Sequence, residues 1–327
     1  MARLARVTAM LLRPPAALVL FVFAAIGMAQ AGPVELDDPR FLAVLAVVAG
    51  WFVNATALND LADEQIDRVN LAGARGRPLI SGDATRNEVL ALGSACGVAA
   101  VLIAMAIDPR AAAVVAIGLG LNAAYSLPAV GLSGRGALTA LLLPLGYTAV
   151  PFLIGAFSAG AAVGGQELLL LGAMYVAFIG RIVLKDFRDE RGDAMFAKRT
   201  LLVRYGPTWT CIASASCWIM GTALLIVALP SDPALLGAFV AYLACALHGL
   251  RRLRLSREYV SQQVLVGSIA RIGGGMALTL LAHYSATAEQ WPSSQREILI
   301  LVLAAFFVAW YATSSLDVKR VTVIRPW

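Results

Sequence analysis

The chain has 327 residues, of which 60% are hydrophobic and only 14% are charged, and its net charge is +6. Soluble globular proteins carry nearer ~25% charged residues, so this composition and a mean hydropathy of +0.78 exclude a soluble globular protein. Apolar runs recur along the whole length, so we expect a single transmembrane domain over residues 1–327 rather than a soluble domain with an anchor.

The first apolar run covers about 15–31, follows three arginines and ends in Ala29-Gln30-Ala31, which resembles a secretory signal peptide. Because many apolar runs follow, we interpret it as an uncleaved transmembrane helix. The candidate spans are about 15–31, 41–58, 88–107, 111–127, 137–158, 167–184, 208–229, 234–250, 263–283 and 297–315. We therefore predict an all-α, polytopic membrane bundle of nine to ten transmembrane helices.

The basic residues test this count, because ten spans place both termini and every even-numbered loop on one side of the membrane. Of the 26 Lys and Arg residues, 21 fall on that side and three on the other, while Arg181 and Arg271 lie within spans. The excess indicates that this side is cytoplasmic, with both termini there. The positive charge is thereby explained by membrane orientation, and we expect no nucleic-acid partner.

Cysteine and histidine contribute no candidate site. The four cysteines lie singly inside apolar runs without metal-binding spacing, so we interpret them as small hydrophobic residues. Only two histidines occur, both beside apolar runs, which argues against a histidine metal site or a Ser-His-Asp hydrolase.

Two acidic clusters directly follow apolar runs and share the same spacing of three and then four residues. Their members are Asp60, Asp63, Asp67, Asp186, Asp189 and Asp193. On a helix these offsets fall within an arc of about 60°, so each trio would project from one face. Crowded carboxylates are tolerated when solvated, when neutralised by bases, or when they hold a hard divalent cation. Two matched trios at the cytoplasmic ends of spans favour the metal site.

Basic residues accompany both trios in the two longest cytoplasmic loops, about 59–87 and 185–207. Arg75 and Arg77 follow the first trio, and Lys198 and Arg199 follow the second. Orientation alone explains any single base. As a set beside clustered acids, they indicate a site for an anion held jointly by cations and metal, such as a diphosphate.

The stretch Asn59-Asp60-x-x-Asp63-x-x-x-Asp67 resembles the first signature of the UbiA superfamily of intramembrane prenyltransferases, and Arg77-Pro78-Leu79-Ile80-Ser81-Gly82 is similar to the segment that often follows it. Lys185-Asp186-x-x-Asp189-x-x-Gly192-Asp193 resembles the second signature. The resemblance covers about 15–285, so the span at about 297–315 is an addition. Tyr125-Ser126-Leu127-Pro128-Ala129 departs from the usual Tyr-Ser-x-Pro-Pro plus base, and Arg135 is the candidate substitute for that base.

The resemblance implies Mg²⁺-dependent transfer of an isoprenyl group from an allylic prenyl diphosphate to an aromatic or other lipophilic acceptor. The reaction would take place in a central cavity of the bundle, with the active-site loops on the cytoplasmic side. Alternatives on the same scaffold are a membrane terpene cyclase and a phosphoribosyl transferase to polyprenyl phosphate. A secondary transporter is the alternative from another class, but its acids should lie near mid-span at broken helices.

The resemblance also implies roles for individual residues. The catalytic acids are Asp60, Asp63, Asp67, Asp186, Asp189 and Asp193. The Mg²⁺ ligands are Asn59, Asp63, Asp67, Asp189 and Asp193. The diphosphate-binding residues are Arg68, Arg77, Tyr125, Arg135, Lys185, Arg188 and Lys198. The expected partners are the prenyl diphosphate, its lipophilic acceptor and membrane lipids.

Overall fold

The computed structural model describes residues 2–71, 76–127, 132, 137–196, 198–229 and 232–321. Every regular element in these residues is a helix. The chain divides into two compact units. The first comprises Met1–Val163 and Glu190–Thr200, and the second comprises Gly164–Asp189 and Leu201–Trp327.

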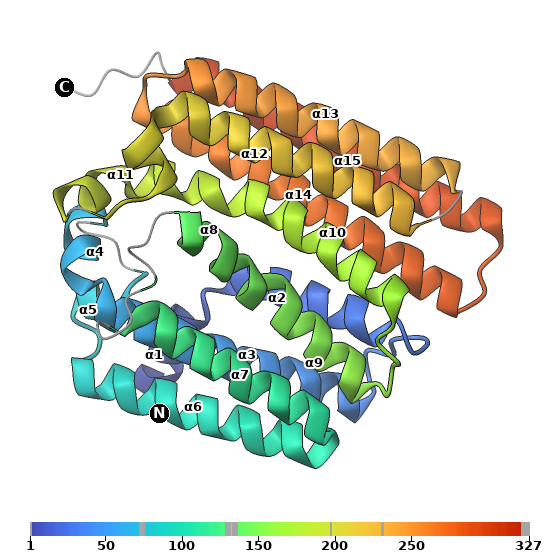
Figure 1. Ribbon diagram of the computed structural model, residues 1–327, viewed down its shortest axis with the longest axis horizontal. Helices are drawn as coiled ribbons and strands as arrows, with labels where there is room; N and C mark the ends of the chain where they lie inside the picture. Colours follow the sequence, from blue (N-terminus) through green and yellow to red (C-terminus); the bar gives the residue numbers. More distant parts are fainter. Residues whose placement is uncertain are drawn as a thin grey trace. The chain divides into compact units, whose positions relative to one another are not determined.

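The first unit contains most of the N-terminal half of the chain. Its helices are α1 (Ala2–Leu12), α2 (Pro14–Met28), α3 (Pro39–Ala62), α4 (Glu64–Asn70), α5 (Pro78–Ser81), α6 (Arg86–Ile107), α7 (Pro109–Ser126), α8 (Ala137–Pro144), the π-helix η2 (Leu145–Ala149) and α9 (Val150–Ser158). In Figure 1, α3 runs beside α6 and α7, and α2 packs on α9. The elements α8, η2 and α9 form one continuous helical stretch, Leu138–Ser158, although it contains Pro144 and Pro151.

The second unit begins with α10 (Gly165–Ile182) and the 3₁₀ turn η3 (Val183–Lys185). The rest of the series is α11 (Asp186–Met195), which crosses the boundary between the units, α12 (Leu201–Ala228), α13 (Pro233–Leu255), α14 (Tyr259–Ala288) and α15 (Ser293–Val321). α10 packs on α12, and α14 packs on α13 and α15 (Figure 1).

Hydrogen bonds between side chains fasten the C-terminal helix α15 to its neighbours. His248 Nδ1 of α13 lies 2.8 Å from the Tyr311 hydroxyl of α15. Ser268 Oγ of α14 lies 3.1 Å from Ser314 Oγ of α15. Little water competes for such bonds within a membrane bundle, so each holds α15 against the unit.

The prediction of a polytopic helix bundle is confirmed. Among the described residues, eight helices are long and apolar enough to cross a membrane, or nine if the α1–α2 pair, bent by 62°, forms one span. α7 occupies the place of the fourth predicted span but is not one of them, because Arg110 and Asn122 reduce its apolar character. The count therefore reaches the lower end of the predicted nine to ten only when the α1–α2 pair is taken as one span. The orientation argument used ten spans, so the cytoplasmic placement stays a prediction.

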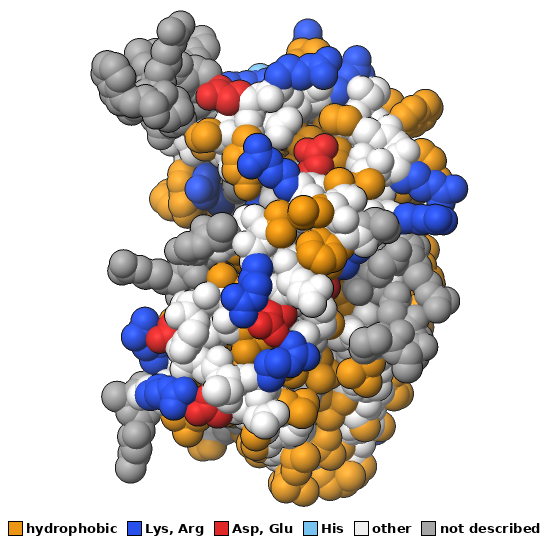
Figure 2. All heavy atoms as spheres, turned by 90° about the vertical axis from the view of Figure 1, so that its left-hand side faces the viewer, with side chains coloured by type: hydrophobic (Ala, Val, Ile, Leu, Met, Phe, Trp, Pro, Cys, Tyr) orange, Lys and Arg blue, Asp and Glu red, His pale blue; other side chains and the backbone are white. Residues whose placement is uncertain are grey.

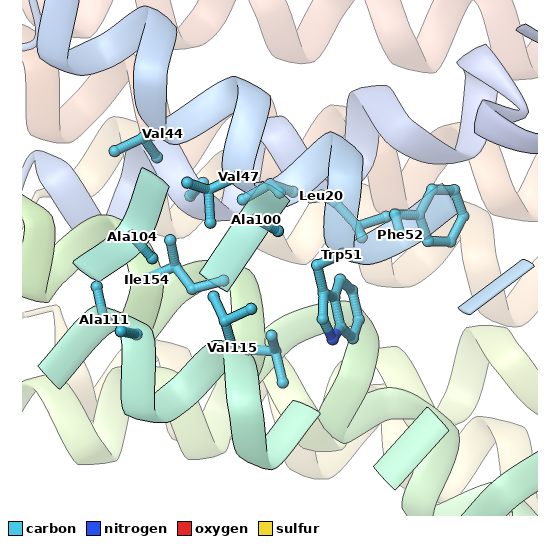
Figure 3. Close-up of a cluster of buried hydrophobic side chains, with 14 of the residues drawn as sticks. Leu20, Val44, Val47, Trp51, Phe52, Ala100, Ala104, Ala111, Val115 and Ile154 are labelled. Carbon is cyan, nitrogen blue, oxygen red and sulfur yellow. The ribbon is translucent and has the colours of Figure 1, made fainter. Parts of the chain in front are cut away.

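The core of the first unit is a cluster of apolar side chains from α2, α3, α6, α7 and α9. Figure 3 shows members of this cluster from several helices, with Trp51 and Phe52 of α3 as the largest. Lipid tails are as apolar as these side chains, so helix association depends on close van der Waals packing rather than on the hydrophobic effect. Small residues at the helix contacts are therefore decisive.

α2 and α9 show the closest such contact. A Cβ atom at Gly27 would overlap the carbonyl oxygen of Phe152, and one at Gly155 would overlap the carbonyl oxygen of Ala24. Each helix thus presents a glycine to the backbone of the other. No larger residue fits at either position without moving the helices apart.

Three helices begin with an Asp-Pro pair in which the aspartate caps the first turn. In α3, Asp38 Oδ1 accepts the Arg40 N–H at 2.7 Å, and Pro39 needs no such partner. We expect Asp38→Ala to lower the free energy of unfolding by about 1 kcal/mol, because one donor of the first turn loses its acceptor. Unfolding followed by circular dichroism in detergent measures this, with the neighbouring Asp37→Ala as the control. Equal stability of both variants would contradict the capping role.

Candidate active site

The first acidic motif lies where α3 ends and α4 begins. Asn59 and Asp60 belong to the last turn of α3, Asp63 stands between the two helices, and Asp67 belongs to α4. The predicted single helix is therefore interrupted at Asp63, whose φ and ψ are −97° and 11°. Helical hydrogen bonds nevertheless continue, because the Asp63 N–H reaches Asn59 O at 2.9 Å and the Asp67 N–H reaches Asp63 O at 2.8 Å.

Asp60 is the most buried acid of the motif, with 2% of its surface exposed. Its Oδ1 accepts from the guanidinium groups of Arg13 and Arg77, which reach it from the α1–α2 junction and from the start of α5. Arg77 Nη1 also lies 3.7 Å from Asp67 Oδ2. A buried carboxylate is retained only when cations and hydrogen bonds compensate its lost hydration. Asp60 thus orients two arginines beside the motif.

Asp63 connects the motif with a segment 135 residues downstream. Its Oδ1 accepts from Lys198 Nζ at 2.8 Å, and its Oδ2 accepts from Asn59 Nδ2 at 3.0 Å. The Lys198 N–H in turn donates to the Asp193 carbonyl oxygen at 2.8 Å. Lys198, which follows α11 closely in the chain, therefore contacts the first motif.

The second acidic motif lies on α11, where Asp186 and Asp193 are buried and Arg188 is exposed. The Gly192 N–H donates to Asn70 Oδ1 at 2.6 Å, and a Cβ atom at Gly192 would meet the Asn70 amide. The C-terminal part of α11 is thereby held against α4 within the first unit. Asp186 and Asp189 belong to the second unit, so their position relative to the first motif stays a prediction.

The remaining residues predicted to bind the diphosphate occupy different settings. Arg68 is exposed and pairs at 2.8 Å with Glu64, whose pKa it lowers by this hydrogen bond. Tyr125 and Lys185 are half-buried, at the end of α7 and in η3 respectively. Arg135 lies outside the described residues. Figure 2 views the end of the molecule where α4 and α5 lie and shows basic and acidic side chains mixed on this face.

A sequence profile of the UbiA prenyltransferase family matches residues 18–266. The chain belongs to this family.

Individual relatives are distant. The chain is 32% identical over 170 residues to digeranylgeranylglyceryl phosphate synthase of Methanopyrus kandleri, covering 50% of this chain and 58% of the relative. It is 29% identical over 178 residues to 4-hydroxybenzoate octaprenyltransferase of Methylobacillus flagellatus, covering 49% and 56%. The matched stretch thus spans little more than half the length of these curated relatives.

A solved structure extends the likeness to almost the whole fold. The structure of a UbiA homolog from Archaeoglobus fulgidus bound to DMAPP and Mg²⁺ superposes with a TM-score of 0.58 at 15% identity. The match covers 94% of this chain and 99% of that chain. At this identity, the likeness establishes the fold.

Two residues that contact the acidic motifs were not predicted as site residues. Arg13 entered the sequence analysis only as an orientation signal, although its position in Arg13-Pro14-Pro15, between two apolar stretches, distinguishes it from the other N-terminal arginines. It adopts a φ of 46° at the α1–α2 junction. Asn70 lies one turn after Asp67, on the same side of α4, which is the signal that could have identified it.

The oxygen donors at the first motif suit the Mg²⁺ that the UbiA resemblance implies. Carboxylate and amide oxygens are the hard ligands that Mg²⁺ prefers, and Asn59, Asp63 and Asp67 supply such oxygens at the junction of α3 and α4. Among the residues that the structure describes, no three His, Cys, Asp or Glu side chains gather as a ready metal cluster. Lys198 instead pairs with Asp63, and Arg77 lies near Asp67. The residues fit Mg²⁺ chemically, and in this structure Lys198 and Arg77 lie beside the predicted ligands Asp63 and Asp67.

Proposed function

We propose that this protein transfers an isoprenyl group from an allylic prenyl diphosphate to an aromatic or other lipophilic acceptor within the membrane, with Mg²⁺ as cofactor. The observation that supports this most strongly is the contact between Lys198 and Asp63. It joins the loop after the second motif to the first motif in a chain of the UbiA prenyltransferase family. Acids and bases from distant segments thus meet where a metal-bound diphosphate needs both.

Asn59, Asp63 and Asp67 are the proposed ligands of one Mg²⁺, and Asp189 and Asp193 those of another. When bound, the metal neutralises diphosphate charge and thereby favours departure of that group. Asp60 holds Arg13 and Arg77 rather than serving as a ligand, because both guanidinium groups converge on its Oδ1.

The protein's own cations would bind the diphosphate directly. Lys198 and Arg77 are both partly buried and beside acids, so each can exchange a carboxylate for a phosphate oxygen without leaving the site. A guanidinium can bind two phosphate oxygens at once, which orients the diphosphate as well as attracting it. Lys185, Arg188 and Arg68 are the further candidates, together with Tyr125.

The membrane helices would keep water from the reactive allylic group. A carbocation-like prenyl group is quenched to an alcohol by water, so an apolar chamber directs it to the acceptor instead. The proposed site accordingly lies at helix ends, where a charged head can be held while an isoprenoid tail extends among apolar helices. We propose that this site is on the cytoplasmic side, which is the side to which the ten-span interpretation of the sequence assigns 21 of the 26 basic residues.

A product screen by mass spectrometry tests the proposal. The purified protein is supplied with geranyl, farnesyl or geranylgeranyl diphosphate, with either Mg²⁺ or EDTA. Each reaction includes an aromatic acid, a glyceryl phosphate lipid or no acceptor. We expect a prenylated product that requires both Mg²⁺ and an acceptor. Cyclic products formed without acceptor, or no turnover with any combination, would contradict prenyl transfer.

A further inference from the structure

Arg271 is a charged residue in a membrane-spanning helix, and the proposed reaction does not use it. It lies within α14, Tyr259–Ala288, which is one of the eight candidate spans. Its side chain is exposed, so it faces outward from the unit. Arginine in the spanning part of a helix is costly and usually has a functional partner.

The environment of Arg271 is aromatic. Its Cζ lies 5.3 Å from the ring centre of Trp310 on α15, and Trp310 is 42% exposed. Among the side chains that the structure describes, no carboxylate forms an ion pair with Arg271. The aromatic face attracts the cation but leaves its charge unneutralised.

The direction of the Arg271 side chain places its charge toward the N-terminal end of α14. Gly267 lies one turn earlier, and a Cβ atom there would be 3.9 Å from Arg271 Nη2. The side chain therefore folds back along the helix over a position that has no side chain of its own. Long basic side chains extend in this way from an apolar segment to the level of the lipid headgroups.

The N-terminal end of α14 is also the end that contacts the second acidic motif. Gln263 Nε2 donates to the Phe187 carbonyl oxygen of α11 at 3.1 Å. Arg271 follows Gln263 by eight residues, a rise of about 12 Å along the helix, part of which the folded-back side chain recovers. The side chain therefore carries the guanidinium from the middle of α14 toward that end of the helix, and a tryptophan beside a cation is typical of the lipid headgroup level.

The neighbouring surface of α15 is apolar and exposed. Phe306 is 57% exposed and lies one turn before Trp310, with 5.7 Å between ring centres, and Val302 is 60% exposed a further turn away. The surface therefore presents a cation and an indole at one level, followed by apolar side chains toward the membrane interior. This order matches the order of phosphate and acyl chain in a lipid.

We propose that Arg271 and Trp310 form a binding site for an anionic phospholipid. The guanidinium binds the phosphodiester, and an acyl chain lies along Phe306 and Val302. The proposal does not depend on prenyl transfer, since it concerns the α14–α15 surface of the second unit alone. Anionic lipids fit because a cation without a carboxylate partner among the described side chains gains most from a ligand with net negative charge.

Native mass spectrometry of the protein in nanodiscs tests this site with phosphatidylglycerol and phosphatidylcholine as probes. We expect the wild type to retain phosphatidylglycerol in preference to phosphatidylcholine, and Arg271→Gln to weaken phosphatidylglycerol binding about fivefold. Trp310→Leu should weaken it about threefold. Arg271→Lys keeps the charge and should stay closer to wild type, which also protects the test against misfolding of the glutamine variant.

Arg257→Gln is the matched control, because Arg257 is an exposed arginine in the connection before α14 and stacks on no ring among the described residues. Its loss should leave lipid retention unchanged. Equal retention by wild type and Arg271→Gln would overturn the site. So would an equal loss in Arg257→Gln, which would indicate general surface charge instead, or a wild type that does not distinguish the two lipids.

Discussion

Replacing Asp63 by Ala is expected to reduce Mg²⁺-dependent prenyl transfer by on the order of 10²–10³-fold, while the protein remains folded. Asp63 is a proposed metal ligand and the acceptor for both Lys198 and Asn59. Its loss removes a ligand and leaves Lys198 without the carboxylate that positions it. Product formation by mass spectrometry measures the effect, and Asp189→Ala should behave alike as a proposed ligand of the second ion.

Glu64→Ala is the matched control for this experiment. Glu64 is the acid next to Asp63, but it pairs with Arg68 and Arg86 and is not a proposed metal ligand. We expect this variant to keep activity within about threefold of wild type, since only surface ion pairs are lost. Full activity in Asp63→Ala, or an equal loss in both variants, would contradict the assignment of Asp63.

Gly155→Val is expected to destabilise the protein by about 3 kcal/mol or more. The valine Cβ would overlap the carbonyl oxygen of Ala24, and a backbone atom cannot rotate aside as a flexible side chain can. α2 and α9 must therefore separate, which removes the close packing on which helix association in lipid depends. Thermal unfolding in detergent measures the loss.

Gly120→Ala provides the control for the glycine experiment. Gly120 lies in α7 and is exposed, and a Cβ atom there meets no other atom within 4 Å. We expect this variant to be neutral or up to ~1 kcal/mol more stable, because alanine favours the helix. If Gly155→Val unfolds at the same temperature as Gly120→Ala, the α2–α9 contact does not limit stability.

Much of the architecture could be predicted from the sequence, because each membrane-spanning helix requires a long run of apolar residues. The helix α14 was confirmed even though Arg271 and three consecutive glycines interrupt its apolar pattern. The bend at Arg13 and the break at Asp63 were not predicted, since both depend on contacts with distant residues. Hydropathy reports which segments are apolar, but not where a helix turns.

The acidic residues of the candidate site could be predicted from the sequence, but not every side chain that pairs with them could. The repeated spacing identified Asp60, Asp63 and Asp67 as a set, and all three lie at the junction of α3 and α4. Arg13 was overlooked because a base near the N-terminus serves orientation equally well. Its pairing with Asp60 arises from the way the α1–α2 junction meets α3, which no local pattern encodes.

The tie between Gly192 and Asn70 has a consequence for the order of synthesis. The first unit includes Glu190–Thr200, a segment that emerges only after α10. During synthesis, α3 and α4 therefore form before the segment that contacts them. Asn70 can bind Gly192, and Asp63 can bind Lys198, only after more than a hundred further residues have been made. The first unit is thus not encoded by one continuous stretch of the gene. A chain that ended before Lys198 would lack the cation that pairs with Asp63 in the first motif.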